Sequence, residues 1–296
     1  MRALNFGSLN IDYVYSVAHT VKPGETLSAG SCSSFCGGKG LNQSVALARA
    51  GAEVFHAGSI GSDGEMLREK LDEFGVNTDF ISVTTGQSGH AIIQVSDDGQ
   101  NAILVYGGAN KTITEKQIDD VLASFNAGDF LFLQNEINSV EYLIRKAKSM
   151  GLTTVFNPSP FTPEILSLPL GSLSFIVVNE TEANELTGKT SAIDIISAFS
   201  EKYPGVNVLL TLGEDGSVCS FNGEVCRQPA FCVKAVDTTA AGDTFTGFFF
   251  AFLDRVGVRE ALRVASAASA LAVSRAGASD SVPTVDEVMS FLSTHE

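Results

Sequence analysis

The chain has 296 residues and a formal net charge of −15, and 44% of its residues are apolar against 18% charged. This length suits one large domain, with or without a small appendage, and the composition is typical of a globular protein. The acidic excess argues against nucleic-acid binding, because no basic patch is available to neutralise phosphates. No apolar run approaches the roughly 18 residues of a membrane span, so no membrane partner is expected.

The five cysteines form no C-x-x-C pair, and the four histidines are scattered along the chain. This spacing gives no basis for a disulfide framework or a zinc site. The N-terminus runs directly into a strand-like segment and lacks the apolar region of a signal peptide. We therefore expect a cytoplasmic protein with reduced thiols.

The first part of the chain begins with extended segments. A short apolar run at 4–6 predicts a strand that leads into GSLNID, and residues 13–35 show no helical period. Gly37 and Gly38 then open a helix of apolar and small residues that stops at Gly51. A strand, EVFHAGSIG, and a helix, GEMLREKLDEFGV, follow.

The later parts of the chain change rhythm. Short β-like runs occupy 79–106, and the turn residues at 97–99 predict a hairpin between the last two runs. From 114 onward, strands and helices alternate as far as NVLLTLG, and a hairpin-like stretch at 217–236 follows. The chain then ends in three predicted helices, at 242–255, 258–275 and 284–294.

These elements predict an α/β fold. Strands that are apolar on both faces and alternate with helices indicate a doubly wound, mostly parallel sheet flanked by helices. The early β-only segments do not fit that rhythm and predict a small separate sheet, built from about 12–35 and 88–106. Because there is no internal repeat or long linker, we expect a single domain over residues 1–296.

Polar residues follow several of the predicted strands. Asn10 and Asp12 follow the first strand, Glu136 follows DFLFLQ, and Asn179 and Thr211 follow two later apolar runs. In doubly wound sheets, ligands bind beyond the carboxyl ends of the strands. We expect a ligand site there, although ordinary loop chemistry could explain each residue singly.

The stretch VDTTAAGDTFTG, residues 236–247, has the features of an anion site. The small residues at 240–242 precede an apolar helix, whose first turn exposes unpaired N–H groups and the positive end of the helix dipole. Asp243 lies in that turn and could take a proton from a hydroxyl as it attacks a phosphorus atom. The N–H groups of 240–243 would stabilise the transferring phosphoryl group. The alternative is that Asp243 only stabilises the helix terminus.

Two common nucleotide-binding motifs are missing. The chain contains no G-x-x-x-x-G-K-[ST] and no G-x-G-x-x-G, and the superficially similar GGKG and GSIGSDG have the wrong spacing. The chain therefore lacks the main motif of P-loop enzymes and that of dinucleotide-dependent dehydrogenases.

The four stretches GSLNID, CGGKGLNQSVALARAGA, VNETEANELTG and VDTTAAGDTFTG, taken in this order, resemble the ribokinase-like carbohydrate kinase family. LTLGEDGSV and AVSRAGASDSVP extend the resemblance over essentially the whole chain. It implies an α/β body with a small β-sheet lid, and transfer of the γ-phosphoryl group of ATP to a sugar hydroxyl. It also implies Mg²⁺ with the ATP, a monovalent cation such as K⁺, and a homodimer joined through the lids.

The resemblance implies roles for individual residues. Asp243 matches the catalytic base, which also faces the sugar, and Ala241 and Gly242 match the anion hole. The residues that match sugar contacts are Asn10, Asp12, Gly38, Lys39, Asn42 and Glu136. Among these, Asp12 corresponds to a carboxylate that grips two sugar hydroxyls, for which a carboxylate is chemically suited. The alternative for Lys39 is that it is only a solvated charge on the surface and does not contact the sugar.

The nucleotide and metal residues follow from the same resemblance. Those that match nucleotide contacts are Asn179, Thr211, Gly213, Ala240, Gly242 and Ser266. Glu182 matches a residue that organises Mg²⁺ indirectly. The alternative is that Glu182 is an acid in the first turn of a helix and only stabilises that helix terminus. The residues that match the monovalent-cation loop, several through backbone carbonyls, are Asp237, Thr239, Arg275, Ala278 and Ser281.

The sugar is less well defined than the reaction. The resemblance favours D-ribose, giving D-ribose 5-phosphate, with deoxyribose, fructose or a nucleoside as alternatives. Cys36, His90 and Asn135 depart from the family pattern near the sugar end, and Phe248 departs where the family prefers a small residue. A non-catalytic sugar- or nucleotide-binding homologue is a remote alternative, against which the intact Asp243 argues.

Overall fold

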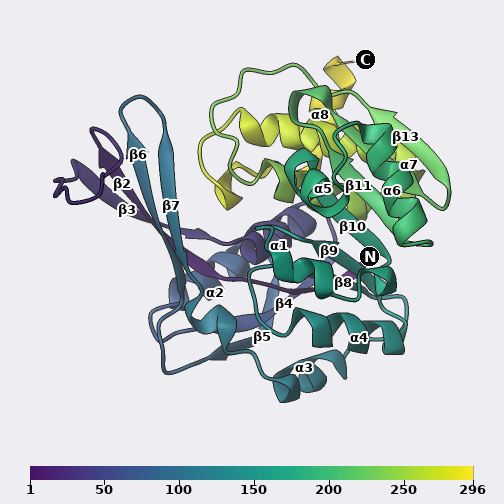
Figure 1. Cartoon of the computed structure of the whole chain (residues 1–296), viewed down its shortest axis with the longest axis horizontal. Coiled ribbons are helices and arrows are strands. Elements are labelled where there is room, and N and C mark those ends of the chain that lie inside the picture. Colours follow the sequence, from purple (N-terminus) through teal and green to yellow (C-terminus); the bar gives the residue numbers. More distant parts are fainter. Residues whose placement is uncertain (296) are drawn as a thin grey trace.

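The computed structural model of the chain describes residues 1–295 and contains two sheets (Figure 1). The larger has nine strands in the order β13-β12-β11-β10-β9-β8-β1-β4-β5, and every pairing from β11 to β5 is parallel. Its strands are β1 (Arg2–Phe6), β4 (Glu53–Ile60), β5 (Asn77–Val83), β8 (Phe130–Gln134), β9 (Thr153–Asn157), β10 (Phe175–Asn179), β11 (Asn207–Thr211), β12 (Ser217–Phe221) and β13 (Glu224–Gln228). The antiparallel hairpin β12–β13 forms one edge.

Helices cover both faces of this sheet. They are α1 (Lys39–Arg49), α2 (Glu65–Glu73), α3 (Glu115–Leu122), α4 (Val140–Met150), α5 (Glu180–Thr187), α6 (Ala192–Lys202), α7 (Ala241–Val273) and α8 (Val285–Thr294). One apolar cluster joins the sheet to α1, α2, α7 and α8, and a second joins it to α3–α6. Successive residues of β8 enter alternate clusters, since Phe132 faces the first and Leu133 the second. The predicted doubly wound, mostly parallel sheet is confirmed.

The long helix α7 contains the helix that the sequence predicts at 242–255 and most of the one predicted at 258–275, since it ends at Val273. Gly257 lies between them with a φ of 78° and a ψ of 169°, which interrupts the helical backbone. The first segment carries the phenylalanines 248–250, all fully buried. Within residues 1–295, no helix is long and apolar enough to cross a membrane.

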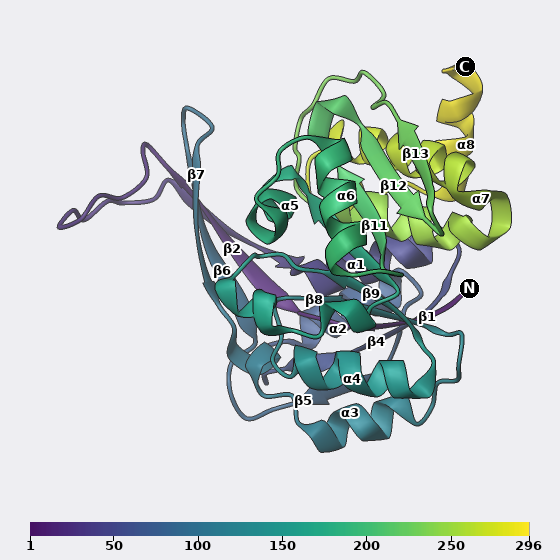
Figure 2. The ribbon, with the colours of Figure 1, turned by 45° about the vertical axis from the view of Figure 1, so that its right-hand side comes forward.

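The smaller sheet has four strands in the order β3-β2-β6-β7. They are β2 (Asn10–Val17), β3 (Ser31–Gly37), β6 (Gly89–Ser96) and β7 (Asn101–Tyr106). The sheet projects from the body, and the loop between β2 and β3 extends furthest from it (Figures 1 and 2). The predicted small sheet is thus confirmed, and its first strand begins slightly before the predicted segment, at Asn10.

The small sheet leaves large apolar side chains uncovered. Along β7, Ile103, Leu104, Val105 and Tyr106 are 55%, 68%, 55% and 55% exposed. Because successive side chains of a strand point to opposite faces, both faces of β7 are uncovered. The large sheet differs sharply, since all five residues of β8 are buried.

Candidate active site

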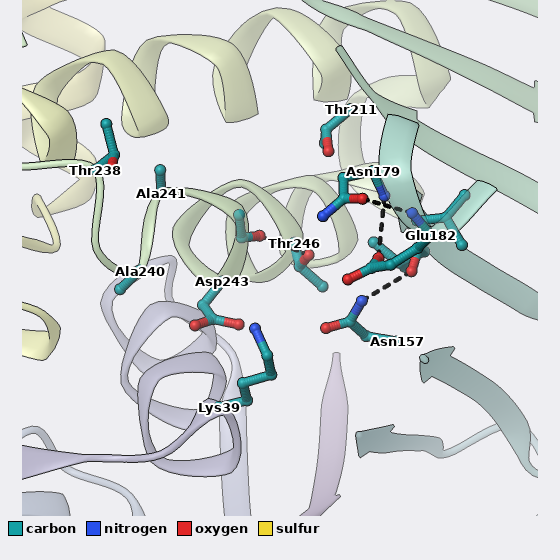
Figure 3. A pocket seen from close by; sticks show the side chains of 13 residues that line it. Lys39, Asn157, Asn179, Glu182, Thr211, Thr238, Ala240, Ala241, Asp243 and Thr246 are labelled. Atoms are coloured by element: carbon teal, nitrogen blue, oxygen red, sulfur yellow. Dashed lines mark hydrogen bonds between the residues drawn. The ribbon is translucent and has the colours of Figure 1, made fainter. Parts of the chain in front are cut away.

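A cavity of about 200 Å³ opens at the carboxyl ends of three adjacent parallel strands. Asn157, Asn179 and Thr211 are the last residues of β9, β10 and β11, and all three line it (Figure 3). The opposite wall is the beginning of α7. The predicted site residues that line the cavity are Lys39, Asn179, Glu182, Thr211, Ala240, Ala241, Gly242 and Asp243. This is the edge of the sheet at which a doubly wound fold binds its ligands.

The first turn of α7 presents backbone donors to the cavity. Ala240 holds a φ of 58° just before the helix, a conformation that costs a residue with a side chain about 1–3 kcal/mol. The N–H of Ala241 donates to the carbonyl of Thr238 at 3.3 Å. Within residues 1–295, the N–H groups of Gly242 and Asp243 have no hydrogen-bond partner. Two free N–H groups at a helix N-terminus suit an anion, as the sequence predicts.

Asp243 is held from the side by α1. Its carboxylate is only 7% exposed and accepts hydrogen bonds from Asn42 Nδ2 at 3.3 Å and from Gln43 Nε2 at 2.9 Å. The two helices approach closely because Gly247 packs on Ala46, where any larger side chain would collide with the α1 backbone. The carboxylate therefore has a fixed orientation at the cavity wall. Gln43 was not among the predicted site residues, although its polar side chain falls on the buried face of α1.

Lys39 places its ammonium in the same cavity, beside the Asp243 carboxylate (Figure 3). Burial lowers the pKa of this lysine, but the carboxylates of Asp243, Glu136 and Glu182 outweigh the burial and leave the pKa above its usual value. Lys39 is therefore a permanent positive charge among three acids. The sequence assigns Lys39 to the sugar, and the structure also brings it together with the residues assigned to the nucleotide.

Glu182 and Asn179 form a reciprocal cap at the beginning of α5. The N–H of Glu182 donates to Asn179 Oδ1 at 2.9 Å, and the N–H of Asn179 donates to Glu182 Oε2 at 3.1 Å. Both residues also line the cavity, and Glu182 is 6% exposed. Glu182 therefore does both: it caps α5 and it lines the candidate site.

The predicted sugar contacts gather around two carboxylates near the base of the small sheet. Glu136 accepts hydrogen bonds from the N–H of Lys39 at 3.0 Å and from the hydroxyl of Ser8. Asp12 lies in β2, where burial and then the charge of Glu136 raise its pKa from 3.8 to about 7. A buried carboxylate whose ionised form is disfavoured by a neighbouring acid suits a ligand that brings hydroxyl donors.

The remaining predicted sugar residues frame these acids. Asn10 Oδ1 accepts from Asn110 Nδ2 at 2.8 Å, and Asn110 also bonds the backbone of Leu9. Gly38 precedes α1 with a φ of 95°, in a region that favours glycine. Asn110 could not be predicted from local sequence, because it lies 100 positions from Asn10 and is beside it only in the fold.

Two of the three departures from the family pattern near the sugar end point away from Asp12. In the small sheet, Cys36 and His90 are register partners of Ile11, the residue next to Asp12. Alternation along β2 therefore puts them on the opposite face. His90 packs between the rings of Tyr13 and Tyr106 there. The third departure, Asn135, donates to the carbonyl of Pro160 at 2.8 Å.

The residues predicted to bind a monovalent cation lie in two segments, 237–239 and 275–281, and the Asp237 carboxylate is hydrogen-bonded to both. Its carboxylate accepts from the N–H of Thr239 at 2.9 Å and from the N–H of Gly277 at 3.1 Å. Burial raises the pKa of Asp237, but these hydrogen bonds prevail and lower it overall. The guanidinium of Arg275 pairs with Glu287 at 2.6 Å. Because a guanidinium is itself positive and has no acceptor, Arg275 could bind a cation only through its backbone carbonyl. Over residues 1–295, no group of three or more His, Cys, Asp or Glu side chains could hold a metal ion.

Some residues of the cavity were not predicted, and some predicted residues lie outside it. Asn157, Thr238 and Thr246 line the cavity without having been predicted. Ser266 is buried in α7 and Gly213 begins a short turn after β11, and neither lines the cavity. Ala278 and Ser281 lie beyond α7, where the Ser281 hydroxyl donates to the Ala278 carbonyl at 2.8 Å.

Comparisons with known proteins agree with this geometry. The family described as pfkB family carbohydrate kinase matches residues 2–285. A curated ribokinase of Haemophilus influenzae is 39% identical over 97% of this chain and 96% of its own, and a deoxyribokinase of Salmonella typhi is 32% identical over 98% of each. The structure of Arabidopsis thaliana ribokinase complexed with ribose and ATP superposes with a TM-score of 0.87, at 33% identity and covering 98% of each chain.

Proposed function

Because the chain belongs to the pfkB family of carbohydrate kinases, we propose that it transfers the γ-phosphoryl group of ATP to a hydroxyl of a sugar. D-Ribose is the proposed sugar and D-ribose 5-phosphate the product. The observation that carries this proposal is a buried carboxylate, Asp243, beside two free N–H groups at a helix N-terminus. The 39% identity to a curated ribokinase over nearly the whole chain supports ribose in particular.

In the proposed reaction, Asp243 takes the proton from the sugar hydroxyl as the hydroxyl oxygen attacks the γ-phosphorus. The bond from that phosphorus to the β-phosphate oxygen breaks, and ADP leaves. The N–H groups of Gly242 and Asp243 and the ammonium of Lys39 stabilise the negative charge on the transferring group. Asp12 and Glu136 accept hydrogen bonds from hydroxyls of the sugar and so orient it.

Two kinds of cation fit the residues present. Glu182, whose Oε2 accepts from the N–H of Asn179, lines the cavity and would help to hold Mg²⁺ indirectly. Mg²⁺ supplied with ATP would neutralise phosphate charge. The backbone carbonyls near Asp237 and Arg275 suit a monovalent cation such as K⁺, which is hard and prefers oxygen ligands.

A panel of acceptors tests the proposed function. ADP release is measured with D-ribose, 2-deoxyribose, fructose and a nucleoside, each with and without Mg²⁺ and with K⁺ or no monovalent cation. We expect the highest kcat/KM with D-ribose, no turnover without Mg²⁺ and faster turnover with K⁺. A higher kcat/KM with 2-deoxyribose would overturn ribose as the substrate, in line with the deoxyribokinase relative. No phosphorylation of any acceptor would overturn the kinase itself.

We also propose that two copies pair through the small sheet, which would act as a lid over the sugar. Uncovered apolar side chains on both faces of β7, such as Leu104 and Val105, support this because a monomer rarely exposes such a patch. Light scattering should give the mass of a dimer at micromolar concentration, and Leu104→Lys should give a monomer. A monomeric wild type would overturn the pairing. The cytoplasmic location stays a prediction.

A further inference from the structure

A chain of buried side-chain amides lies beneath Asp243. It begins at Gln43 on α1, continues through Gln134 at the end of β8, and ends at Asn5 on β1. These three side chains are 1%, 1% and 0% exposed. None of the three lines the cavity, and a buried amide is costly unless it is hydrogen-bonded. Three buried amides at this place therefore indicate a role beyond packing.

The amides form one continuous set of hydrogen bonds. Gln43 donates from Nε2 to Asp243 Oδ1 at 2.9 Å and accepts at Oε1 from Gln134 Nε2 at 2.7 Å. Gln134 Nε2 also donates to Asn5 Oδ1 at 3.0 Å. Asn5 Nδ2 then donates to the backbone carbonyl of Gly40 at 2.8 Å. The chain thus connects the carboxylate to a carbonyl in the first turn of α1.

The two ends of this chain fix the direction of every bond in it. The carbonyl of Gly40 only accepts, so Asn5 must turn its NH₂ group toward it and its oxygen toward Gln134. Gln134 must then donate to Asn5 and, with its second hydrogen, to Gln43. This leaves the NH₂ group of Gln43 for Asp243. A reversed amide at any position would place two buried oxygens face to face, at a large energetic cost.

We propose that Gln43, oriented by Gln134 and Asn5, is a positioning residue that holds Asp243 as a hydrogen-bond acceptor aimed into the cavity. This inference rests on the proposed function, in which Asp243 takes the proton of the sugar hydroxyl. Asn42 holds the other carboxylate oxygen at 3.3 Å, a longer contact, so Gln43 makes the stronger of the two bonds. A carboxylate held in this way stays in position while the sugar hydroxyl attacks the phosphorus. This matters because a small displacement of the base slows the reaction.

The first test replaces the donor. We expect Gln43→Leu to lower kcat about 10- to 100-fold, as for a lost hydrogen bond to a charged group. The KM values for sugar and ATP should change less than about twofold, because Gln43 is proposed to touch neither ligand. The matched control is Gln117→Leu, since Gln117 is a partly buried glutamine that donates to the Gly58 carbonyl at 3.0 Å. It should keep the wild-type kcat, and thermal unfolding should report folded protein in both cases.

The second test separates positioning from a structural role and serves if Gln43→Leu does not fold. In Gln43→Glu, the protonated side chain donates to Asp243 as the amide does, whereas the ionised side chain repels it. The kcat of this variant should therefore fall as pH rises. Its profile of kcat against pH should show a descending limb that is absent from the profiles of the wild type and of Gln43→Leu. A residue that only fills space would not create that limb.

The third test asks whether Gln134 acts through Gln43. Gln134→Met should lower kcat severalfold in the wild type and have no further effect in the Gln43→Leu background. A wild-type kcat in Gln43→Leu, no new limb in Gln43→Glu, or additive effects in the double variant would each overturn the inference. Asp243→Asn distinguishes this failure from that of the proposed function. If Asp243→Asn abolishes turnover while Gln43→Leu is unaffected, only the positioning role is wrong.

Discussion

The two halves of the candidate site are built on different sheets and are prepared in different ways. The phosphoryl half belongs to the large sheet and α7, where Asp243 already accepts from Asn42 and Gln43. The sugar half lies at the base of the small sheet, where burial and the charge of Glu136 raise the pKa of Asp12. Asp243 is held by two donors before any ligand binds, whereas within residues 1–295 no protein donor is bonded to the carboxylate of Asp12, and sugar hydroxyls could supply such donors.

This difference indicates how the work is divided between the halves. A carboxylate that serves as a base needs a fixed position in every state, so its partners come from the protein. Carboxylates that recognise hydroxyls gain specificity if their hydrogen bonds are satisfied only by the correct ligand. Substitutions in the phosphoryl half should therefore reduce kcat, and substitutions in the sugar half should mainly raise the KM for the sugar.

The largest effect is expected at Asp243. Asp243→Asn keeps the shape of the side chain but removes the proton acceptor, so kcat should fall about 10²- to 10⁴-fold. The KM values for ribose and ATP should change little, which steady-state kinetics with ADP detection will measure. Asp254→Asn, an exposed acid further along α7, is the control and should match the wild type. Turnover of Asp243→Asn at the wild-type rate would show that another group is the base.

The sugar half should respond in KM. Asp12→Asn replaces one of two carboxylate oxygens by an NH₂ group, so hydrogen bonds from sugar hydroxyls to a charged acceptor are lost. We expect the KM for ribose to rise about 10- to 100-fold, and the KM for ATP to stay within about twofold. Asp97→Asn, in the turn between β6 and β7 of the same sheet, should leave both unchanged. A fall in kcat without a change in KM would contradict the division between the halves.

The pH dependence of sugar binding tests the role of Asp12 in the sugar half. The pKa of Asp12 is raised to about 7 by burial and by Glu136, and sugar hydroxyls bind best to the ionised carboxylate. Ribose affinity measured by calorimetry should therefore increase by up to about tenfold per pH unit below pH 7 and level off above it. Glu136→Gln removes the neighbouring charge, so the midpoint of this profile should move to lower pH. An affinity independent of pH between 6 and 8 would argue against Asp12 as a sugar ligand.

The sequence allowed the phosphoryl half to be predicted more fully than its supports. The residues VDTTAAGD are contiguous, so the small residues, the helix start and Asp243 can all be seen in one segment. Gln43 and Gln134 are 91 positions apart, and Asn10 and Asn110 are 100 apart. Such pairs meet only through the sheet order, which no local pattern contains. The face of His90 likewise required the register of β2 and β6.

Stability should respond to pH in opposite directions in the two regions. His56 lies fully buried on β4, bonded to the Ser44 hydroxyl at 2.8 Å, and burial lowers its pKa from 6.5 to about 3. The unfolded chain therefore binds a proton that the folded chain refuses, so stability is full above pH 6.5 and is lost as pH falls toward 3. Asp12 has the opposite sign, because the stability gained from its protonated form is lost as pH rises through about 7.

Urea unfolding of a His56 variant between pH 4.5 and 6.5 should isolate the contribution of this histidine. His56→Gln retains a polar group for Ser44 but does not titrate, so its free energy of unfolding should rise less, or fall more, with increasing pH than that of the wild type. The difference in slope should approach about 1.4 kcal/mol per pH unit. His19→Gln, which replaces an exposed histidine next to Glu25, provides the control. Equal slopes in the wild type and His56→Gln would mean that the acid sensitivity of the large sheet arises from other groups, and that His56 accepts its proton without unfolding.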